Sequence, residues 1–101
     1  MRVELLWWEG CPSTPEALAD LQRVLHEEGV DAQIEQVEVL SDEQAREERF
    51  PGSPTIRING HDIVDPEEAE PFSLTCRVYR LRNGRVSPTP DPEDIREAVY
   101  R

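Results

Sequence analysis

Lysine is absent from this sequence of 101 residues, so all 11 basic residues are arginine. The 22 aspartates and glutamates outnumber them and give a formal net charge of −11. A surface this negative repels anionic lipids and the phosphate backbone of nucleic acids. We therefore expect neither nucleic acid nor a membrane surface as a partner.

Long hydrophobic runs and cysteines are also scarce. The apolar run from Leu5 to Trp8 is too short for a signal sequence or a membrane span, so we expect a cytoplasmic protein. The two cysteines are Cys11 and Cys76. In the cytoplasm such residues are more often catalytic or metal-binding than part of a structural disulfide. The length is typical of one domain. We expect no cofactor.

The first half of the chain predicts a parallel β-α-β unit. Residues 2–8 are almost continuously apolar, as in a central strand covered on both faces. Apolar side chains then recur at helical spacing over 13–28, and Gly29 ends this helix. Residues 32–40 predict a second strand. Because the links are short, we expect the two strands to be parallel neighbours.

The middle of the chain predicts a short helix and a hairpin. The helix covers 42–49, with Ser41 or Asp42 as its cap. Residues 55–58 alternate like a strand, and Asn59-Gly60 is typical of a type I′ turn that leads to a return strand at 61–64.

The last third predicts further short elements. Residues 65–68 resemble the start of a helical turn. Residues 74–81 predict a strand with Leu74, Cys76, Val78 and Tyr79 buried, and 85–86 a return strand after Asn83-Gly84. A final helix starts within 91–94. The order β-α-β-α-β-β-α predicts an α/β fold with a mixed sheet of four to five strands and helices on both faces.

This order and two short segments resemble the thioredoxin-like superfamily. Residues 7–14 resemble its active-site turn, in which a cysteine follows the first strand and opens the first helix. Residues 53–55 occupy the place of the cis-proline that precedes the third strand in that superfamily. The closer resemblance is to small bacterial thioredoxin-like proteins, some labelled alkylmercury lyase-like. They share the segments found here at Gly10 to Pro12, Phe50 to Thr55 and Cys76 to Arg80.

The resemblance implies a single thioredoxin-like domain over 1–101 and a redox site. Thr14 stands where a Cys-x-x-Cys motif has its second cysteine, which argues against disulfide exchange by two neighbouring thiols. A monothiol site remains, or a pair in which Cys76 is the distant resolving thiol. The implied site residues are Cys11 and Cys76, supported by Pro12, Ser13, Thr14, Ser53, Pro54 and Thr55.

The chemistry of Cys11 depends on where the first helix begins. A helix N-terminus favours the thiolate, and Cys11 can cap the helix with Pro12 at its first position. Alternatively Ser13 and Glu16 form a capping box, which leaves Cys11 two residues outside. The Thr14 hydroxyl is then a candidate donor to the thiolate, whereas nearby glutamates raise a thiol pKa. A small buried hydrophobic residue is the alternative role for Cys11.

Three further alternatives concern the other candidate residues. From the sequence alone Pro54 is expected to be a trans proline in a loop, because only about 5% of X–Pro bonds in folded proteins are cis, whereas the resemblance implies cis. Cys76 is either a core residue or a redox partner, and a disulfide requires Cα atoms within about 7 Å. Cys11, Cys76 and His61 offer three metal ligands, but their spacing matches no recognised metal pattern.

We therefore carry three hypotheses. The first is a thiol–disulfide redox protein that acts through Cys11 on protein or small-molecule thiols and disulfides, with Cys76 as the candidate resolving thiol. The second is a soft-metal or organomercurial-binding thiol protein. The third is a non-catalytic thioredoxin-fold binding module whose acidic surface meets a basic partner.

Overall fold

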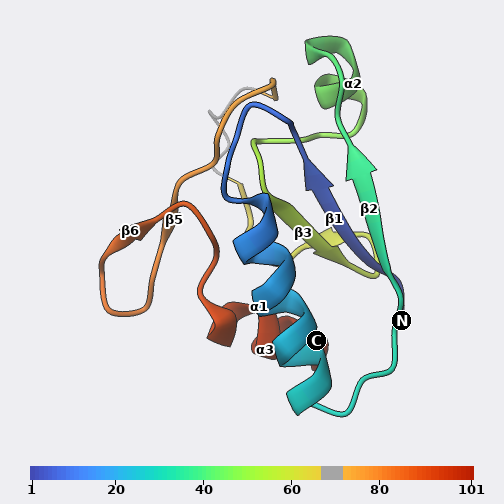
Figure 1. The fold of residues 1–101 in the computed structure, drawn as a ribbon, viewed down its shortest axis with the longest axis vertical. Coiled ribbons are helices and arrows are strands. Elements are labelled where there is room, and N and C mark those ends of the chain that lie inside the picture. Colours follow the sequence, from blue (N-terminus) through green and yellow to red (C-terminus); the bar gives the residue numbers. More distant parts are fainter. Residues whose placement is uncertain (67–71) are drawn as a thin grey trace.

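The computed structural model describes residues 1–66 and 72–101, which form an α/β fold (Figure 1). Up to Ile58 each observed boundary lies within two residues of its prediction. In the described part of the chain, no helix is long and apolar enough to cross a membrane. The elements are β1 (Val3–Trp7), α1 (Thr14–Glu27), β2 (Ile34–Glu38), α2 (Asp42–Glu47), β3 (Thr55–Ile58), β4 (His61–Asp62), β5 (Tyr79–Arg80), β6 (Val86–Ser87) and α3 (Pro92–Val99).

Within the described residues, the main sheet has four strands in the order β2-β1-β3-β4. Strand β1 is parallel to β2, as the predicted β-α-β unit requires, and antiparallel to β3. The β3–β4 hairpin turns at Asn59 and Gly60, whose φ angles of 53° and 83° have the positive sign that a type I′ turn needs. The sheet is therefore mixed, with β1 at its centre.

Helices cover both faces of this sheet. On one face Leu5 shares a core cluster with Leu21 of α1 and Ile95 of α3. On the other face Leu6 shares a second cluster with Phe50, which follows α2. Successive strand residues point to opposite faces, so these clusters confirm the predicted covering of both. Figure 1 shows α1 and α3 together, with α2 set apart near the end of β2.

The predicted strand over 74–81 is wrong in its extent. Strand β5 covers two residues and pairs with β6 in a separate two-stranded sheet, so it adds no fifth strand to the main sheet. In the described chain before β5, the strand pairing is limited to an isolated bridge between Cys76 and Ser53, in the loop that precedes β3. The helical turn predicted from Asp65 extends into residues 67–71, which lie outside the described residues.

The predicted buried positions of this segment also need correction. Tyr79 is buried as predicted, but Cys76 and Val78 are exposed and Leu74 is half-buried. The buried neighbour is instead Arg77, with 4% of its surface exposed. In an extended segment alternate side chains share one side, so Arg77 and Tyr79 face inward together.

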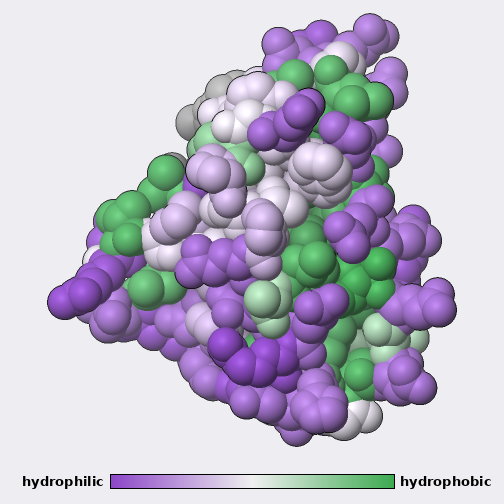
Figure 2. All heavy atoms as spheres, in the orientation of Figure 1, coloured by the Kyte–Doolittle hydropathy of each residue, from purple (hydrophilic) through white to green (hydrophobic). Residues whose placement is uncertain are grey.

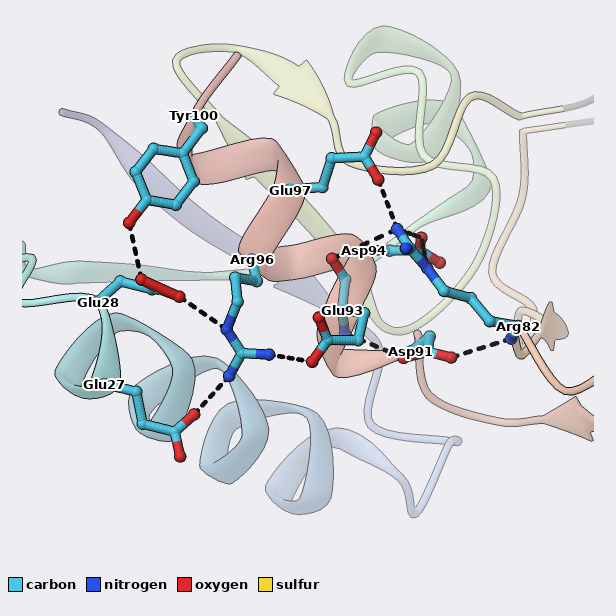
Figure 3. Close-up of polar contacts among 9 residues, drawn as sticks. All are labelled: Glu27, Glu28, Arg82, Asp91, Glu93, Asp94, Arg96, Glu97 and Tyr100. Carbon is cyan, nitrogen blue, oxygen red and sulfur yellow. Dashed lines mark hydrogen bonds and ion pairs between the residues drawn. The ribbon is translucent and has the colours of Figure 1, made fainter.

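An exposed ion-pair cluster joins α3 to the end of α1 (Figure 3). Arg96 pairs with Glu27 at 2.6 Å and Glu28 at 2.7 Å, and with Glu93 one turn earlier on α3. The Tyr100 hydroxyl donates to Glu28 at 2.7 Å. Because partly exposed pairs contribute little free energy each, this cluster adds only modestly to the packing of α1 against α3.

A second arginine fixes the β5–β6 hairpin to α3 (Figure 3). The backbone N–H of Arg82 donates to the Asp91 carboxylate at 2.9 Å, and its guanidinium pairs with Asp94 at 2.9 Å and Glu97 at 2.5 Å. Asp91 also caps α3 by accepting a hydrogen bond from the Glu93 backbone N–H at 2.9 Å. The hairpin is thus held in a defined position against the body of the protein.

Candidate functional site

Cys11 lies in the loop between β1 and α1. Its backbone N–H donates to the carbonyl of Trp8 at 3.1 Å, which closes a turn directly after the strand. Helix α1 begins at Thr14 with Ser13 as its N-cap, so the alternative in which Cys11 caps the helix is wrong. The Ser13 side chain makes no capping hydrogen bond with the described residues, so the predicted capping box is also not formed.

Cys76 is covalently bonded to Cys11. The two Cα atoms are 5.7 Å apart although 65 positions separate the residues in sequence. Cys76 therefore reaches Cys11, within the distance that a disulfide requires. The burial of the two partners differs sharply: Cys11 is 4% exposed, whereas Cys76 is an exposed residue. The disulfide therefore connects the interior of the site with the surface of the protein.

Ser53 holds both cysteine-bearing segments in place. Its hydroxyl accepts a hydrogen bond from the backbone N–H of Trp8 at 3.1 Å, close to Cys11. Its backbone N–H donates to the carbonyl of Thr75 at 2.8 Å, and its carbonyl accepts from the N–H of Arg77 at 2.9 Å. These two bonds flank Cys76 and place it opposite Ser53.

The loop around Ser53 has the geometry that the resemblance implied. The Ser53–Pro54 peptide bond is cis, which confirms that expectation. The backbone N–H and carbonyl of Ser53 are both bonded to the chain's own segment, at Thr75 and Arg77. Gly52 has a φ of 146°, and a Cβ there would lie 2.9 Å from the Arg77 nitrogen, so glycine permits this close approach.

Arg77 is the buried anchor of the Cys76 segment. Its guanidinium pairs with Asp62 of β4 at 2.8 Å and donates to the carbonyl of Val64 at 2.7 Å and the hydroxyl of Thr55 at 3.3 Å. It also lies over the ring of Tyr79, 4.7 Å from the centroid. A buried guanidinium needs several partners to offset its loss of water, and this set provides them.

Burial changes the titration of two groups in this network. It raises the pKa of Asp62 above its ordinary value, although the Arg77 guanidinium opposes the shift. Burial likewise raises the pKa of Tyr79. The Tyr79 hydroxyl therefore stays protonated at neutral pH and donates to the carbonyl of Pro54 at 2.5 Å. This contact adds a further link between β5 and the loop before β3.

Among the remaining supporting residues, Thr14 is the most informative. Its hydroxyl oxygen is buried and has no hydrogen-bond partner among the described residues. Thr55 is also buried, and its hydroxyl donates to the carbonyl of Gly52 at 2.6 Å. Pro12 is exposed and, with Cys11 and Thr14, lines a shallow hollow of about 410 Å³ at the start of α1.

His61 does not join the two cysteines. It lies on β4 at the β3–β4 turn, and it lines hollows that contain neither Cys11 nor Cys76. Within residues 1–66 and 72–101, no group of three or more histidine, cysteine or acidic side chains is placed to hold a metal ion.

Comparison with known proteins provides no relative. The sequence matches no protein-family model and no curated protein, and its structure matches no solved structure.

The sequence motifs point to both cysteines and Ser53 but not to Arg77 and Asp62. The signal for Arg77 was present in the alternation of residues 76–80, where an inward Tyr79 requires an inward Arg77 two positions earlier. Asp62 carries no comparable signal, because a carboxylate after a tight turn is ordinarily exposed.

The raised pKa of Asp62 predicts an unusual pH dependence. Its contribution to the free energy of unfolding is fully present below its unfolded-state pKa of about 3.9 and is lost as the pH rises through the higher folded-state value. We compare the free energy of unfolding of the oxidised wild type with that of oxidised Asp62→Asn. The value for the wild type minus the value for Asp62→Asn should be more positive at about pH 3 than at about pH 7. Urea unfolding at both pH values measures this difference. The exposed Asp31→Asn serves as the control, and a difference for Asp62→Asn that does not change with pH contradicts the assignment.

Proposed function

We propose that this chain is a thioredoxin-like thiol–disulfide redox protein in which Cys11 and Cys76 alternate between a disulfide and two thiols. The observation that carries the proposal is the contact between two cysteines 65 positions apart, one directly after β1 and one opposite Ser53. A parallel β-α-β half, an antiparallel half and a closing helix support the thioredoxin-like assignment.

The exposure of Cys76 favours redox exchange over a purely structural role. Thiol–disulfide exchange requires a thiolate to reach a sulfur atom, and an exposed cysteine at the end of the bond allows such access. A bridge closing 65 positions also stabilises the oxidised chain, by about 4 kcal/mol in the chain-entropy model.

The contacts around the disulfide favour a reversible cycle. Cys76 is held by the backbone bonds of Ser53 and by the partners of Arg77, none of which involves a sulfur atom. After reduction these contacts keep the two thiols within reach of each other. A pair held in this way has a high effective concentration, which favours closure of the disulfide over a lasting mixed disulfide.

Thr14 supplies a donor for the reduced state. Its buried hydroxyl has no partner among the described residues when the disulfide is closed. A Cys11 thiolate three positions earlier in the chain offers an acceptor that only reduction creates. A hydrogen bond to a charged acceptor is worth about 1.5–3 kcal/mol, so this donor favours the thiolate.

The reaction partners in this proposal are protein or small-molecule thiols and disulfides. Oxidation of the two protein thiols reduces one partner disulfide to two thiols, and the reverse reaction consumes two partner thiols and releases their disulfide. We propose the cytoplasm as the location, where the thiol pool returns the protein to its dithiol form.

Reaction of the reduced protein with glutathione disulfide tests the cycle. We expect the wild type to end with an internal Cys11–Cys76 bond and no bound glutathione, because the neighbouring thiol displaces it. Cys11→Ser and Cys76→Ser each lack that second thiol. Unlike the wild type, both variants should retain bound glutathione. Mass mapping after alkylation of free thiols distinguishes these states. A wild type that keeps glutathione without forming the internal bond refutes the proposal.

Replacement of Thr14 tests the proposed hydrogen bond. Thr14→Val removes the donor from the reduced state and an unsatisfied buried hydroxyl from the oxidised state, so both effects favour the disulfide. We expect the equilibrium with a dithiol reductant to shift toward the oxidised protein by at least about tenfold. Thr14→Ser retains the hydroxyl and should restore the wild-type value. An unchanged equilibrium in Thr14→Val would rule out the interaction.

A further inference from the structure

The Cys11–Cys76 disulfide lies at one end of an exposed row of side chains. Cys76, Val78 and Arg80 are all exposed, whereas the residues between them are buried. Strand pairing places Val86 of β6 opposite Arg80, so these two side chains share a face of the hairpin. We name Cys76, Val78, Arg80 and Val86 the outer face.

The outer face carries two strongly exposed apolar side chains. Val78 is 68% exposed and Val86 is 65% exposed. Figure 2 shows hydrophobic atoms gathered over the hairpin, with strongly hydrophilic atoms at its tip. Apolar side chains that are exposed next to each other mark a protein-binding surface more often than apolar side chains scattered singly.

The charge of this region is opposite to that of the whole protein. Residues 72–90 contain four arginines and no acidic residue, in a chain with a net charge of −11. Arg77 and Arg82 are paired with carboxylates, but Arg80 and Arg85 form no ion pair with any described residue. Within the described part of the chain, the hairpin therefore carries two arginines without an ion-pair partner, and Arg80 lies in the same exposed row as Cys76.

The hairpin is fixed from its inner side, which leaves the outer face free. Arg77, two residues before β5, anchors the chain to β4, and Arg82 anchors the turn of the hairpin to α3. The backbone groups of Ser53 are already bonded to the chain's own segment. A partner that reaches the disulfide can therefore pack on the outer face without displacing these contacts.

We propose that a cysteine-bearing polypeptide segment with acidic and apolar side chains docks on the outer face and exchanges at Cys76. This inference rests on the proposed redox function and names its partner class. It also reverses the order of attack expected from the sequence, because the exposed sulfur-bearing residue is Cys76 and Cys11 is 4% exposed. Cys11 is then the resolving residue.

The exchange is balanced in both directions. To reduce the protein, a partner thiolate attacks the Cys76 sulfur, forms a mixed disulfide and releases the Cys11 thiolate. A second partner thiolate attacks the partner sulfur, forms the partner disulfide and releases the Cys76 thiolate. The two protons lost by the partner thiols are taken up by the two protein thiolates. To oxidise the protein, the Cys76 thiolate attacks a partner disulfide, forms a mixed disulfide and releases one partner thiolate. The Cys11 thiolate then attacks the Cys76 sulfur, closes the internal disulfide and releases the second partner thiolate. The two protons lost by the protein thiols are taken up by the two partner thiolates.

Rates of reduction by two synthetic cysteine peptides test the docking surface. The peptides have equal length and the same leucine beside the cysteine, but one is flanked by glutamates and the other by arginines. We expect the acidic peptide to reduce the oxidised wild type about tenfold faster at an ionic strength of about 0.15 M, where a Debye length of about 8 Å screens carboxylates distant from the outer face, and about 1 M salt to narrow the difference. Arg80→Glu should remove this preference, whereas Arg23→Glu on α1 should retain it. Equal rates, or the same loss in both variants, overturn the proposed surface.

Single-cysteine variants test the point of attack. The acidic peptide is supplied as its mixed disulfide with thionitrobenzoate, whose release is coloured. The Cys11→Ser variant reacts through Cys76, and the Cys76→Ser variant reacts through Cys11. We expect the first to take up the peptide at least about tenfold faster, because Cys76 is more accessible than Cys11. A faster reaction at Cys11 overturns the inference about the point of attack. The proposed function survives that result if the wild type still forms its internal disulfide. Failure of the wild type to form that bond refutes the proposed function itself.

Discussion

The site depends on the three hydrogen bonds of Ser53. Its hydroxyl holds the loop that carries Cys11, and its backbone N–H and carbonyl hold the segment that carries Cys76. Ser53 is fully buried, so an unmade bond at any of its polar groups would cost free energy that water cannot recover. Ser53 thereby brings together two segments that are far apart in the chain.

The buried Arg77 makes this arrangement specific. Taking a guanidinium out of water is expensive, and Asp62, Val64 and Thr55 offset that cost only when the segment lies in one position. The same position aims the alternate residues outward, including Cys76 and Val78. A polar network on the inner side thus determines which side chains, and which sulfur-bearing residue, face a partner. The redox pair and its proposed docking surface follow from the same register.

The sequence was sufficient for the elements up to Ile58, because these have strong periodicity and clear turn residues such as Asn59-Gly60. It also pointed to both cysteines and Ser53. It was insufficient after Leu74, because the segment resembles a strand by composition but is fixed by side-chain partners distant in sequence. The burial of Arg77 depends on Asp62, fifteen positions away, and neither residue type predicts a buried position by itself. The exposure of Cys76 follows from that burial and was missed with it.

Hydrogen exchange at the Arg77 amide tests most directly whether docking at Ser53, rather than the disulfide, holds Cys76 beside Cys11. This N–H donates to the Ser53 carbonyl at 2.9 Å. We predict that it remains protected after the disulfide is reduced, with a protection comparable to that of amides in the central strand β1. Exchange at the rate of an unprotected amide in the reduced protein, while β1 remains protected, would show that the disulfide itself holds the segment and would contradict the account.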